Sequence, residues 1–155
     1  MRVLIVEDSA FNAFCLRRLL ESEVTSVMVT IVHDSQAAMS SVNNSLPDIV
    51  IIDGDLGATD KPYCNGPELT ETLLQKNPYL PIIAWSDSDT MREDFASAFM
   101  RHNRLLNEYN IWTKVVGREL ICKTWAYYFD EFMSGQNAAF ADNQANAGLI
   151  SVNAT

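Results

Sequence analysis

The sequence predicts an α/β domain in which five parallel strands alternate with five helices. The first observation is a run of four apolar β-branched residues at positions 49–52, bounded by Pro47 and Gly54. A strand open to water on one side would alternate apolar with polar residues, so this strand is expected to be buried on both faces. The second observation is that short apolar runs alternate along the chain with helical periodicity, which is typical of a sheet wound by right-handed crossovers.

The first strand is expected at residues 2–6, where an apolar run ends in the acidic pair Glu7 and Asp8. A helix follows to about Glu21, with Asp8 or Ser9 as its N-terminal cap. Its apolar residues recur at helical spacing and are therefore expected to face the core. These residues are Phe11, Phe14, Cys15, Leu19 and Leu20.

The middle of the chain predicts a second strand at residues 27–32, a short helix from Asp34 to Val42, and the central strand that ends in Asp53. A long loop rich in turn-forming residues follows at positions 54–65. The next helix begins at Gly66 and ends before Pro78, with Pro67 in its first turn, where a missing N–H is tolerated.

The fourth strand is expected at residues 81–85 and delivers Ser86 to its carboxyl end. A helix at about 89–103 could continue to Asn107, because no glycine ends it. A fifth strand at 110–114 brings Lys114 to the same edge, and a last helix with a wide aromatic stripe covers 117–133. Residues 1–133 thus form the expected domain, and the small and polar residues 134–155 form a tail without an output domain.

The composition indicates a globular protein without nucleic-acid or membrane partners. The chain has 155 residues, 48% of them hydrophobic, and its 20 acidic and 11 basic residues give a net charge of -9, which repels phosphates and anionic lipids. No segment has the length of a membrane span or the pattern of a signal peptide. Cys15, Cys64 and Cys122 fit neither a disulfide framework nor zinc-ligand spacing, so we expect reduced thiols in a cytoplasmic protein.

Polar side chains follow four of the expected strands: Glu7, Asp8, Asp53, Ser86 and Lys114. Taken alone, Asp53 before Gly54 could simply form a turn. The carboxyl ends of parallel strands meet at one edge, however, and three carboxylates gathered there would repel one another unless a hard cation such as Mg²⁺ joined them. A nucleophilic carboxylate, a metal, a lysine and a hydroxyl are together what phosphoryl transfer requires.

With these motifs, the sequence resembles the receiver domain of two-component response regulators from Arg2 to about Met133. The resemblance implies a flavodoxin-like, three-layer α/β/α fold with a doubly wound sheet of strand order 2-1-3-4-5. The motifs that carry it are the pair Glu7-Asp8, the strand ending in Asp53, the helix start Gly66-Pro67-Glu68-Leu69, the strand leading to Ser86, and Lys114.

The resemblance also implies a role for each residue of this group. Asp53 would accept a phosphoryl group from a sensor histidine kinase or a histidine phosphotransfer protein, and the phosphorylated domain would then bind a downstream protein target. Asp8 would bind Mg²⁺ directly, Glu7 would act largely through water, and the backbone carbonyl of Asp55 would complete the coordination. Ser86 would move towards the phosphate, and Lys114 would pair with it.

Several positions depart from the family pattern. The loop between Asp53 and Gly66 is longer than usual, and the acid Asp87 follows Ser86 where the family prefers a small residue. Lys114 is followed by Val115 instead of the usual proline, and Ile111 stands where the family has an aromatic switch residue. Phosphate entry, phosphate lifetime and the switching mechanism are therefore where this protein is expected to differ.

The leading interpretation is a single-domain phosphorylatable receiver that is not an enzyme beyond its own phosphorylation and dephosphorylation. One alternative is a receiver-like module that binds partners without being phosphorylated. The other is a haloacid-dehalogenase-type phosphatase, suggested by Asp53-Gly54-Asp55, but that family needs a late acidic pair at a strand end, whereas Asp130-Glu131 falls in the last helix. The aromatic residues Trp112, Trp125 and Tyr128 are expected to form a partner or homodimer face, or to pack in the core.

Overall fold

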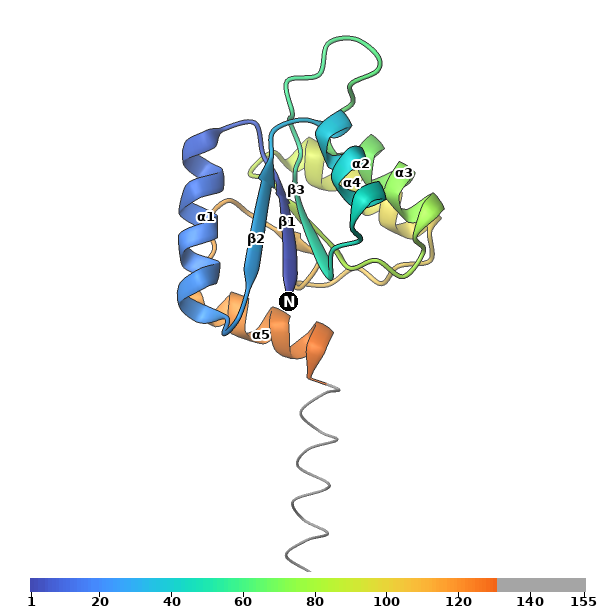
Figure 1. Cartoon of the computed structure of the whole chain (residues 1–155). Helices are drawn as coiled ribbons and strands as arrows, with labels where there is room; N and C mark the ends of the chain where they lie inside the picture. Colours follow the sequence, from blue (N-terminus) through green and yellow to red (C-terminus); the bar gives the residue numbers. More distant parts are fainter. Residues whose placement is uncertain (131–155) are drawn as a thin grey trace, which may run out of the picture.

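The computed structural model describes residues 1–130 and contains a five-stranded sheet in which all paired strands run parallel (Figure 1). The strand order is β2-β1-β3-β4-β5, which confirms the predicted flavodoxin-like topology. The chain reverses its direction of winding between β1 and β3, so a crevice at the carboxyl ends of these strands is the expected ligand position. The strands are β1 Arg2–Val6, β2 Met28–Val32, β3 Ile49–Asp53, β4 Ile82–Trp85 and β5 Ile111–Trp112.

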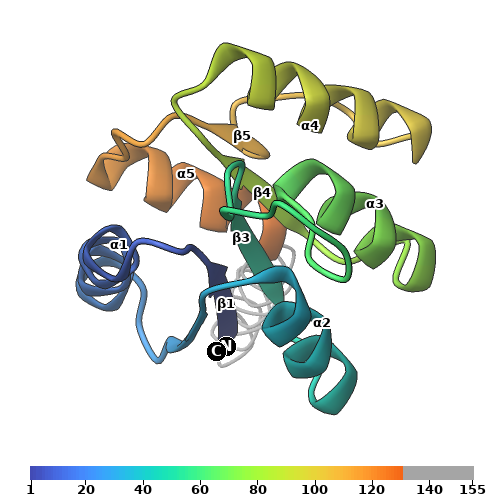
Figure 2. The ribbon, with the colours of Figure 1, turned by 90° about the horizontal axis from the view of Figure 1, so that it is seen from above.

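Helices cover both faces of the sheet, as the view along the strands shows (Figure 2). Buried residues of α1 and α5 pack on one face, and those of α2, α3 and α4 pack on the other. This gives the three predicted layers. The helices are α1 Ala10–Glu23, α2 Ser35–Asn44, α3 Gly66–Lys76, α4 Asp89–Arg101 and α5 Arg118–Phe129.

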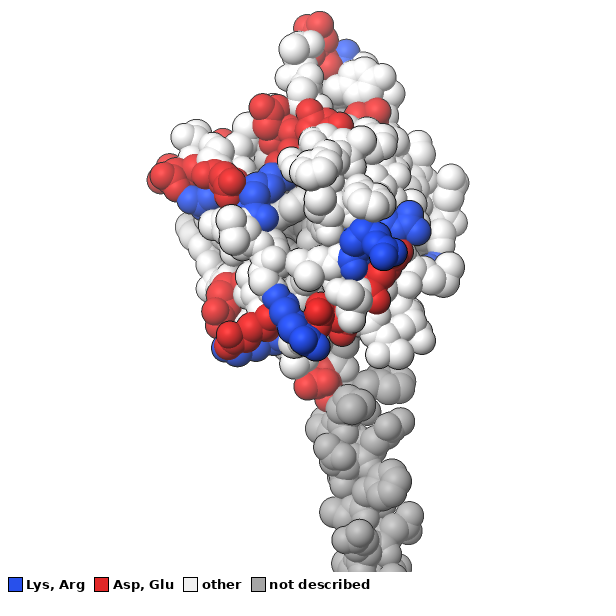
Figure 3. All heavy atoms as spheres, turned by 90° about the vertical axis from the view of Figure 1, so that its left-hand side faces the viewer, with Lys and Arg blue, Asp and Glu red and all other residues white. Residues whose placement is uncertain are grey.

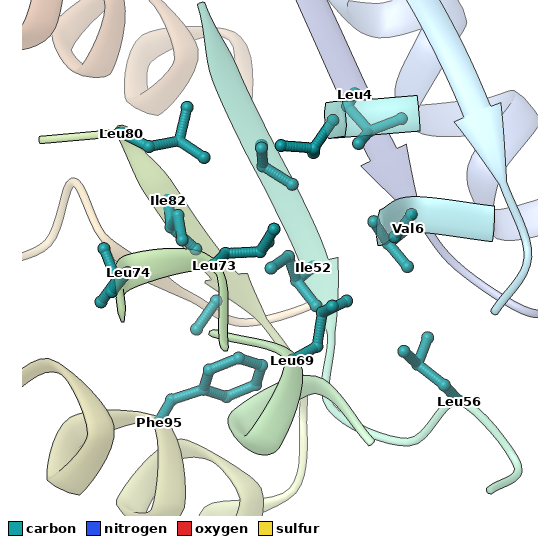
Figure 4. Close-up of a cluster of buried hydrophobic side chains, with 14 of the residues drawn as sticks. Leu4, Val6, Ile52, Leu56, Leu69, Leu73, Leu74, Leu80, Ile82 and Phe95 are labelled. Carbon is teal, nitrogen blue, oxygen red and sulfur yellow. The ribbon is translucent and has the colours of Figure 1, made fainter. Parts of the chain in front are cut away.

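The central strands divide their side chains between two cores with a strict period of two, because successive side chains of a strand point to opposite faces. In β3, Val50 and Ile52 join the core under α2, α3 and α4, while Ile49 and Ile51 join the core under α1 and α5. All five residues of β3 are buried, as the unbroken apolar run predicted. Figure 4 shows Ile52 within the first of these cores, together with Leu56 from the loop that follows Asp53.

Capping side chains set the starts of three helices. The side chains of Ser9, Asp34 and Ser88 accept hydrogen bonds from backbone N–H groups of the first turns of α1, α2 and α4. Helix α4 ends at Arg101 although no glycine follows it. Asn103 supplies the left-handed conformation there, with a φ of 55°, and this conformation is one in which asparagine commonly ends a helix.

The C-terminal elements are shorter than predicted. Strand β5 comprises only Ile111–Trp112, so Thr113 and Lys114 lie beyond the paired part of the sheet. Helix α5 ends at Phe129, with Asp130 as its C-cap, and residues 131–133 of the predicted helix lie outside the described residues. The expected tail at 134–155 lies outside the described residues.

The structure contradicts the prediction for two aromatic residues of α1 and decides between the alternatives for two others. Phe11 and Phe14 were expected in the core, yet both are exposed, because the buried stripe of α1 is made by Ala13, Leu16 and Leu20. For Trp112 and Trp125, which were expected either at a partner face or in the core, the structure shows the second alternative, because both are buried in the core under α1 and α5. Tyr128 is half-buried against the same core, and its neighbour Tyr127 is exposed.

None of the helices in the described part of the chain is both long enough and apolar enough to cross a membrane.

Gly66 lets the start of α3 pack against the backbone at the end of β3. A Cβ atom at this position would lie 2.2 Å from the carbonyl oxygen of Asp53 and 2.5 Å from Cζ of Phe95. The backbone oxygen cannot move without displacing Asp53 itself. The first turn of α3 and the end of β3 therefore share one close contact that only glycine permits.

We predict that Gly66→Ala lowers the free energy of unfolding by about 1 to 3 kcal/mol, which is the usual effect of forcing an extra methyl group into a packed site. Urea unfolding followed by circular dichroism measures the change. Gly117→Ala is the matched control, because a Cβ atom there meets nothing within 4 Å. Equal stability of wild type and Gly66→Ala would contradict the proposed contact.

Candidate functional site

The five predicted site residues come together at the carboxyl edge of the sheet. Glu7 and Asp8 follow β1, Asp53 ends β3, Ser86 follows β4, and Lys114 lies two residues beyond β5. The ammonium nitrogen of Lys114 is 2.9 Å from Oδ1 of Asp53 and also forms an ion pair with Oε2 of Glu7. The edge thus brings together residues separated by as many as 107 positions in the chain.

Two of the carboxylates are almost completely buried, with 1% of Glu7 and 7% of Asp53 exposed. Burial of a charged carboxylate is unfavourable unless hydrogen bonds and opposite charge compensate it. Glu7 meets this need through Lys114 and through the backbone N–H of Ser9, which donates to its Oε1 at 2.9 Å. Lys114 therefore forms ion pairs with two buried acids at once.

The group Glu7, Asp8 and Asp53 has the geometry of a cation site. One carboxylate oxygen from each residue lies within 4.8 Å of the others. Hard divalent cations such as Mg²⁺ and Ca²⁺ prefer oxygen ligands, and Mg²⁺ is commonly held by one or two carboxylates with several waters. The predicted donor set is thus present, and its donors are of the type that Mg²⁺ requires.

The pKa values of two of these acids are raised. Burial raises the pKa of Asp53, while the hydrogen bond and the charge of Lys114 oppose that rise. Partial desolvation raises the pKa of Asp8, and its hydrogen bond and repulsion with Glu7, then the charge of Asp55, add to the rise. It is therefore unfavourable for these acids to be ionised at the same time, and a bound cation would make their ionisation more favourable.

Asp55, whose charge contributes to the raised pKa of Asp8, lies at the start of the loop that follows β3. It is exposed, and its Oδ1 accepts a hydrogen bond from the N–H of Gly57 at 2.9 Å, which bends the start of the loop. Figure 3 shows Asp and Glu side chains gathered at the end of the molecule that carries this loop. The use of the Asp55 backbone carbonyl as a metal ligand stays a prediction.

Ser86 is buried beside Gly54, at the base of the site. Its Oγ accepts a hydrogen bond from the N–H of Ser88 at 3.2 Å, so its hydroxyl oxygen is held near the start of α4. A Cβ atom on Gly54 would lie 3.1 Å from this Oγ and 2.8 Å from Cβ of Met91. The absence of a side chain at position 54 therefore leaves room for Ser86 and α4 next to Asp53.

Two positions have roles that the sequence did not predict. Asp87 accepts a hydrogen bond from the backbone N–H of Lys114 at 2.7 Å, so it anchors the segment that carries the lysine. Nδ1 of His33 lies 2.8 Å from the carbonyl oxygen of Glu7, and a protonated Nδ1 donates to it. An acid after Ser86 was visible in the sequence, but its partner was not, because the contact spans 27 residues.

The long loop at 54–65 is anchored at its base. Leu56 is buried in the core, and the side-chain oxygen of Asn65 accepts hydrogen bonds from the N–H groups of Leu56 and Ala58 at 3.0 and 3.3 Å. Residues 59–63 are exposed, and they form the tip that projects beyond the strands in Figure 1. The extra length is thus placed away from Asp53.

Ile111, at the expected switch position, is half-buried against the core under α2, α3 and α4.

Comparisons with known proteins agree with this fold. A model of the response regulator receiver domain family matches residues 3–103. The crystal structure of the receiver domain of NtrX from Brucella abortus is similar, with a TM-score of 0.67 at 19% identity, and the match covers 83% of this chain and 98% of that one. The signal receiver domain of a modulated diguanylate cyclase from Desulfovibrio desulfuricans G20 has a TM-score of 0.65 at 26% identity, with 84% and 94% covered.

Among curated proteins, the protein-glutamate methylesterase/protein-glutamine glutaminase of group 3 operon from Cereibacter sphaeroides is 29% identical over 85 residues. The match covers 55% of this chain and 21% of that protein. The chain thus spans about a fifth of that relative, and the likeness concerns only that part of it.

We predict that Asp8→Asn raises the melting temperature by about 1 to 3 °C at pH 7 in the presence of a chelator, since Asp8 is exposed and its repulsion is screened. The pKa of Asp8 is higher in the folded protein than in the unfolded chain. Between these two pKa values the folded protein binds more protons than the unfolded chain, so its stability falls as the pH rises through that interval. The charge therefore costs stability at neutral pH. The gain of Asp8→Asn should shrink as pH falls towards the ordinary pKa of aspartate, roughly 4.

Differential scanning fluorimetry at several pH values between 7 and 4.5 measures this difference. Asp60→Asn, at the exposed loop tip, removes the same formal charge away from the group and should change the melting temperature little at any pH. Equal gains in both variants would mean that the net charge of -9, and not the local group, is responsible.

Proposed function

The chain belongs to the response regulator receiver domain family, and from that premise we propose that it is phosphorylated on Asp53 by a sensor histidine kinase or a histidine phosphotransfer protein. The observation that carries the proposal is the environment of Asp53. Its carboxylate ends the central buried strand, lies 2.9 Å from the Lys114 ammonium, and shares a potential cation site with Glu7 and Asp8. A nucleophile, a positive charge and metal ligands are thus gathered at one carboxylate group.

In the proposed reaction, a carboxylate oxygen of Asp53 attacks the phosphorus of a phosphohistidine. The new O–P bond forms as the N–P bond breaks, and the electron pair of that bond returns to the imidazole nitrogen. The ring leaves as neutral imidazole, with its proton either already on the other ring nitrogen or taken up from water by the released one. Lys114, already paired with Asp53, would neutralise charge on the transferred phosphoryl oxygens. Mg²⁺ held by Glu7, Asp8 and Asp53 would supply further neutralisation of the phosphoryl group when bound.

Ser86 is proposed to bind the phosphoryl group afterwards. Its hydroxyl is buried one residue beyond β4 and accepts a long hydrogen bond from the N–H of Ser88, at 3.2 Å. Rotation towards a phosphoryl oxygen would exchange this bond for a charge-assisted one, which is stronger. Such a movement would shift the start of α4 and alter the surface presented to a downstream protein.

We place the docking of the phosphodonor protein on α1 and the segment after β5. Phe11, Phe14 and Val115 are exposed there, and Phe11 exposes 75% of its surface. A cavity of about 170 Å³ between α1 and this segment is lined by Phe11 and by Lys114, so the exposed surface leads to the site. Large exposed apolar side chains grouped next to a reactive carboxylate are what a protein donor could cover.

Two observations bear on the alternatives. A haloacid-dehalogenase-type phosphatase would place its late acidic pair at a strand end, whereas Asp130 directly follows helix α5. A receiver-like module without phosphorylation would not need the ion pairs of Lys114 with Glu7 and Asp53. We therefore favour a phosphoacceptor that turns over no separate substrate.

All three cysteines are free thiols, which supports the proposed cytoplasmic location.

We predict that acetyl phosphate with Mg²⁺ adds one phosphoryl group to the wild-type protein and none to Asp53→Asn. Intact-mass spectrometry measures the adduct, and chelation of the metal should reduce its formation at least tenfold, because the like charges around Asp53 then oppose an incoming phosphate. Asp60→Asn serves as the control and should be phosphorylated like the wild type. An adduct that persists in Asp53→Asn, or none in the wild type, would overturn the proposed function.

We also predict that Phe11→Ser slows phosphotransfer from a phosphorylated histidine phosphotransfer domain by about five- to thirtyfold, which is the usual effect of removing one aromatic anchor of an interface. Its phosphorylation by acetyl phosphate should match the wild type, because Phe11 lies outside the group of charged residues. Tyr79→Ser, which removes an exposed aromatic ring before β4 at the opposite end of the sheet, is the control. Equal transfer rates in both variants would place the donor elsewhere.

A further inference from the structure

Trp85 lies directly beside the phosphoacceptor and beneath the lysine. It is the last residue of β4 and the register partner of Asp53 in the adjacent strand β3. Its side chain is buried, with 4% of the residue exposed, and the ammonium nitrogen of Lys114 lies 3.7 Å from the centroid of its ring. We propose that Trp85 is a positioning residue, whose ring face holds the Lys114 ammonium beside Asp53. This inference rests on the proposed function.

Lys114 needs such support because of where the sheet ends. Strand β5 pairs only through Ile111 and Trp112, so the lysine stands beyond the last pairing of the strand. Asp87 anchors its backbone N–H, which leaves its long side chain to be oriented by other contacts. A lysine side chain loses much rotational freedom when it is held in one position. Trp85 and Asp87, the two neighbours of Ser86, thus restrain the side chain and the backbone of the same lysine.

A tryptophan face suits this position better than another large apolar group would. The face of an indole ring is negative and attracts a cation within about 6 Å of its centroid, most strongly when the pair is shielded from water. The Lys114 ammonium has carboxylates of Glu7 and Asp53 on one side and this ring on another. The ring attracts the cation without offering a further negative charge to a site that must admit a phosphoryl group.

Core packing is the competing explanation for Trp85, because its side chain belongs to the buried cluster under α1 and α5. A buried indole normally uses its N–H to donate a hydrogen bond. The Nε1 atom of Trp85 has no hydrogen-bond partner among the residues that the structure describes. The indole N–H thus forms no hydrogen bond with the described residues. What distinguishes Trp85 from a buried aliphatic residue is the contact of its ring face with Lys114.

Two substitutions separate the roles. Trp85→Phe keeps an aromatic face and loses the unused N–H, whereas Trp85→Leu keeps a buried apolar side chain and loses the face. The chain has four lysines, Lys61, Lys76, Lys114 and Lys123, so selective ¹³C,¹⁵N-lysine labelling gives a readable spectrum, and Lys114→Gln assigns the Lys114 signal. The ε-methylene protons of Lys114 should be displaced upfield in the wild type by the ring beneath them.

We expect this upfield displacement to persist in Trp85→Phe and to disappear in Trp85→Leu. Phosphorylation of Asp53 by acetyl phosphate should be close to the wild-type rate in Trp85→Phe and about fivefold slower in Trp85→Leu, as expected for the loss of one cation–π contact. Lysine signals that are not displaced in the wild type would overturn the proposal without any variant. So would a Trp85→Leu protein that is folded and phosphorylated at the wild-type rate.

The two measurements also separate this inference from the proposed function. If the wild type is not phosphorylated, the proposed function fails, and the lysine spectra alone decide whether Trp85 positions Lys114. If the wild type is phosphorylated but Trp85→Phe is as slow as Trp85→Leu, the ring face is not what matters, and the inference fails while the function stands. If Trp85→Leu does not fold, the upfield displacement of the Lys114 signals still tests the inference. The displacement must be present in the wild type and must persist in Trp85→Phe.

Discussion

The site depends on one electrostatic constraint, which is the burial of two carboxylates beside a third acid with a single lysine between them. Glu7 and Asp53 are removed from water, Asp8 stands next to them, and the Lys114 ammonium contacts both buried acids. Burial and mutual repulsion raise the pKa values of Asp8 and Asp53. A cation that binds at this edge of the sheet would therefore be stabilised by these acids. A fold can hold such a group only if the rest of the structure fixes its members firmly.

The sheet provides that rigidity. Strands β1 and β3 are covered on both faces, so their ends cannot move without disturbing one of the two cores. Gly66 brings the start of α3 into contact with the backbone of Asp53, and Gly54 leaves room beside it for Ser86 and Met91. The position of Asp53, the proposed phosphoacceptor, is thus fixed by its strand, by the helix that follows and by the neighbouring strand, while Lys114 enters from beyond a strand of two residues.

The departures from the family pattern are accommodated around this group without displacing it. The additional loop residues project from a base closed by Leu56 and Asn65. Asp87 hydrogen-bonds to the backbone of Lys114, at the point where the chain has valine instead of the usual proline after the lysine. Phe11 and Phe14, by contrast, enlarge the apolar surface of α1 near the site, which suits recognition more than packing.

The sequence by itself determined the alternation of elements, the two-sided burial of the central strand and the residue types at the strand ends, because all of these are local patterns along the chain. From them, the parallel topology placed Glu7, Asp8, Asp53, Ser86 and Lys114 at one edge. Which aromatic residues are buried depends on tertiary packing: α1 packs on the sheet through Ala13, Leu16 and Leu20, which leaves Phe11 outside, while Trp112 of β5 is buried in the core under α1 and α5. Contacts between distant segments, such as Asp87 or Trp85 with Lys114, likewise depend on the register and the ends of strands, which no local pattern specifies.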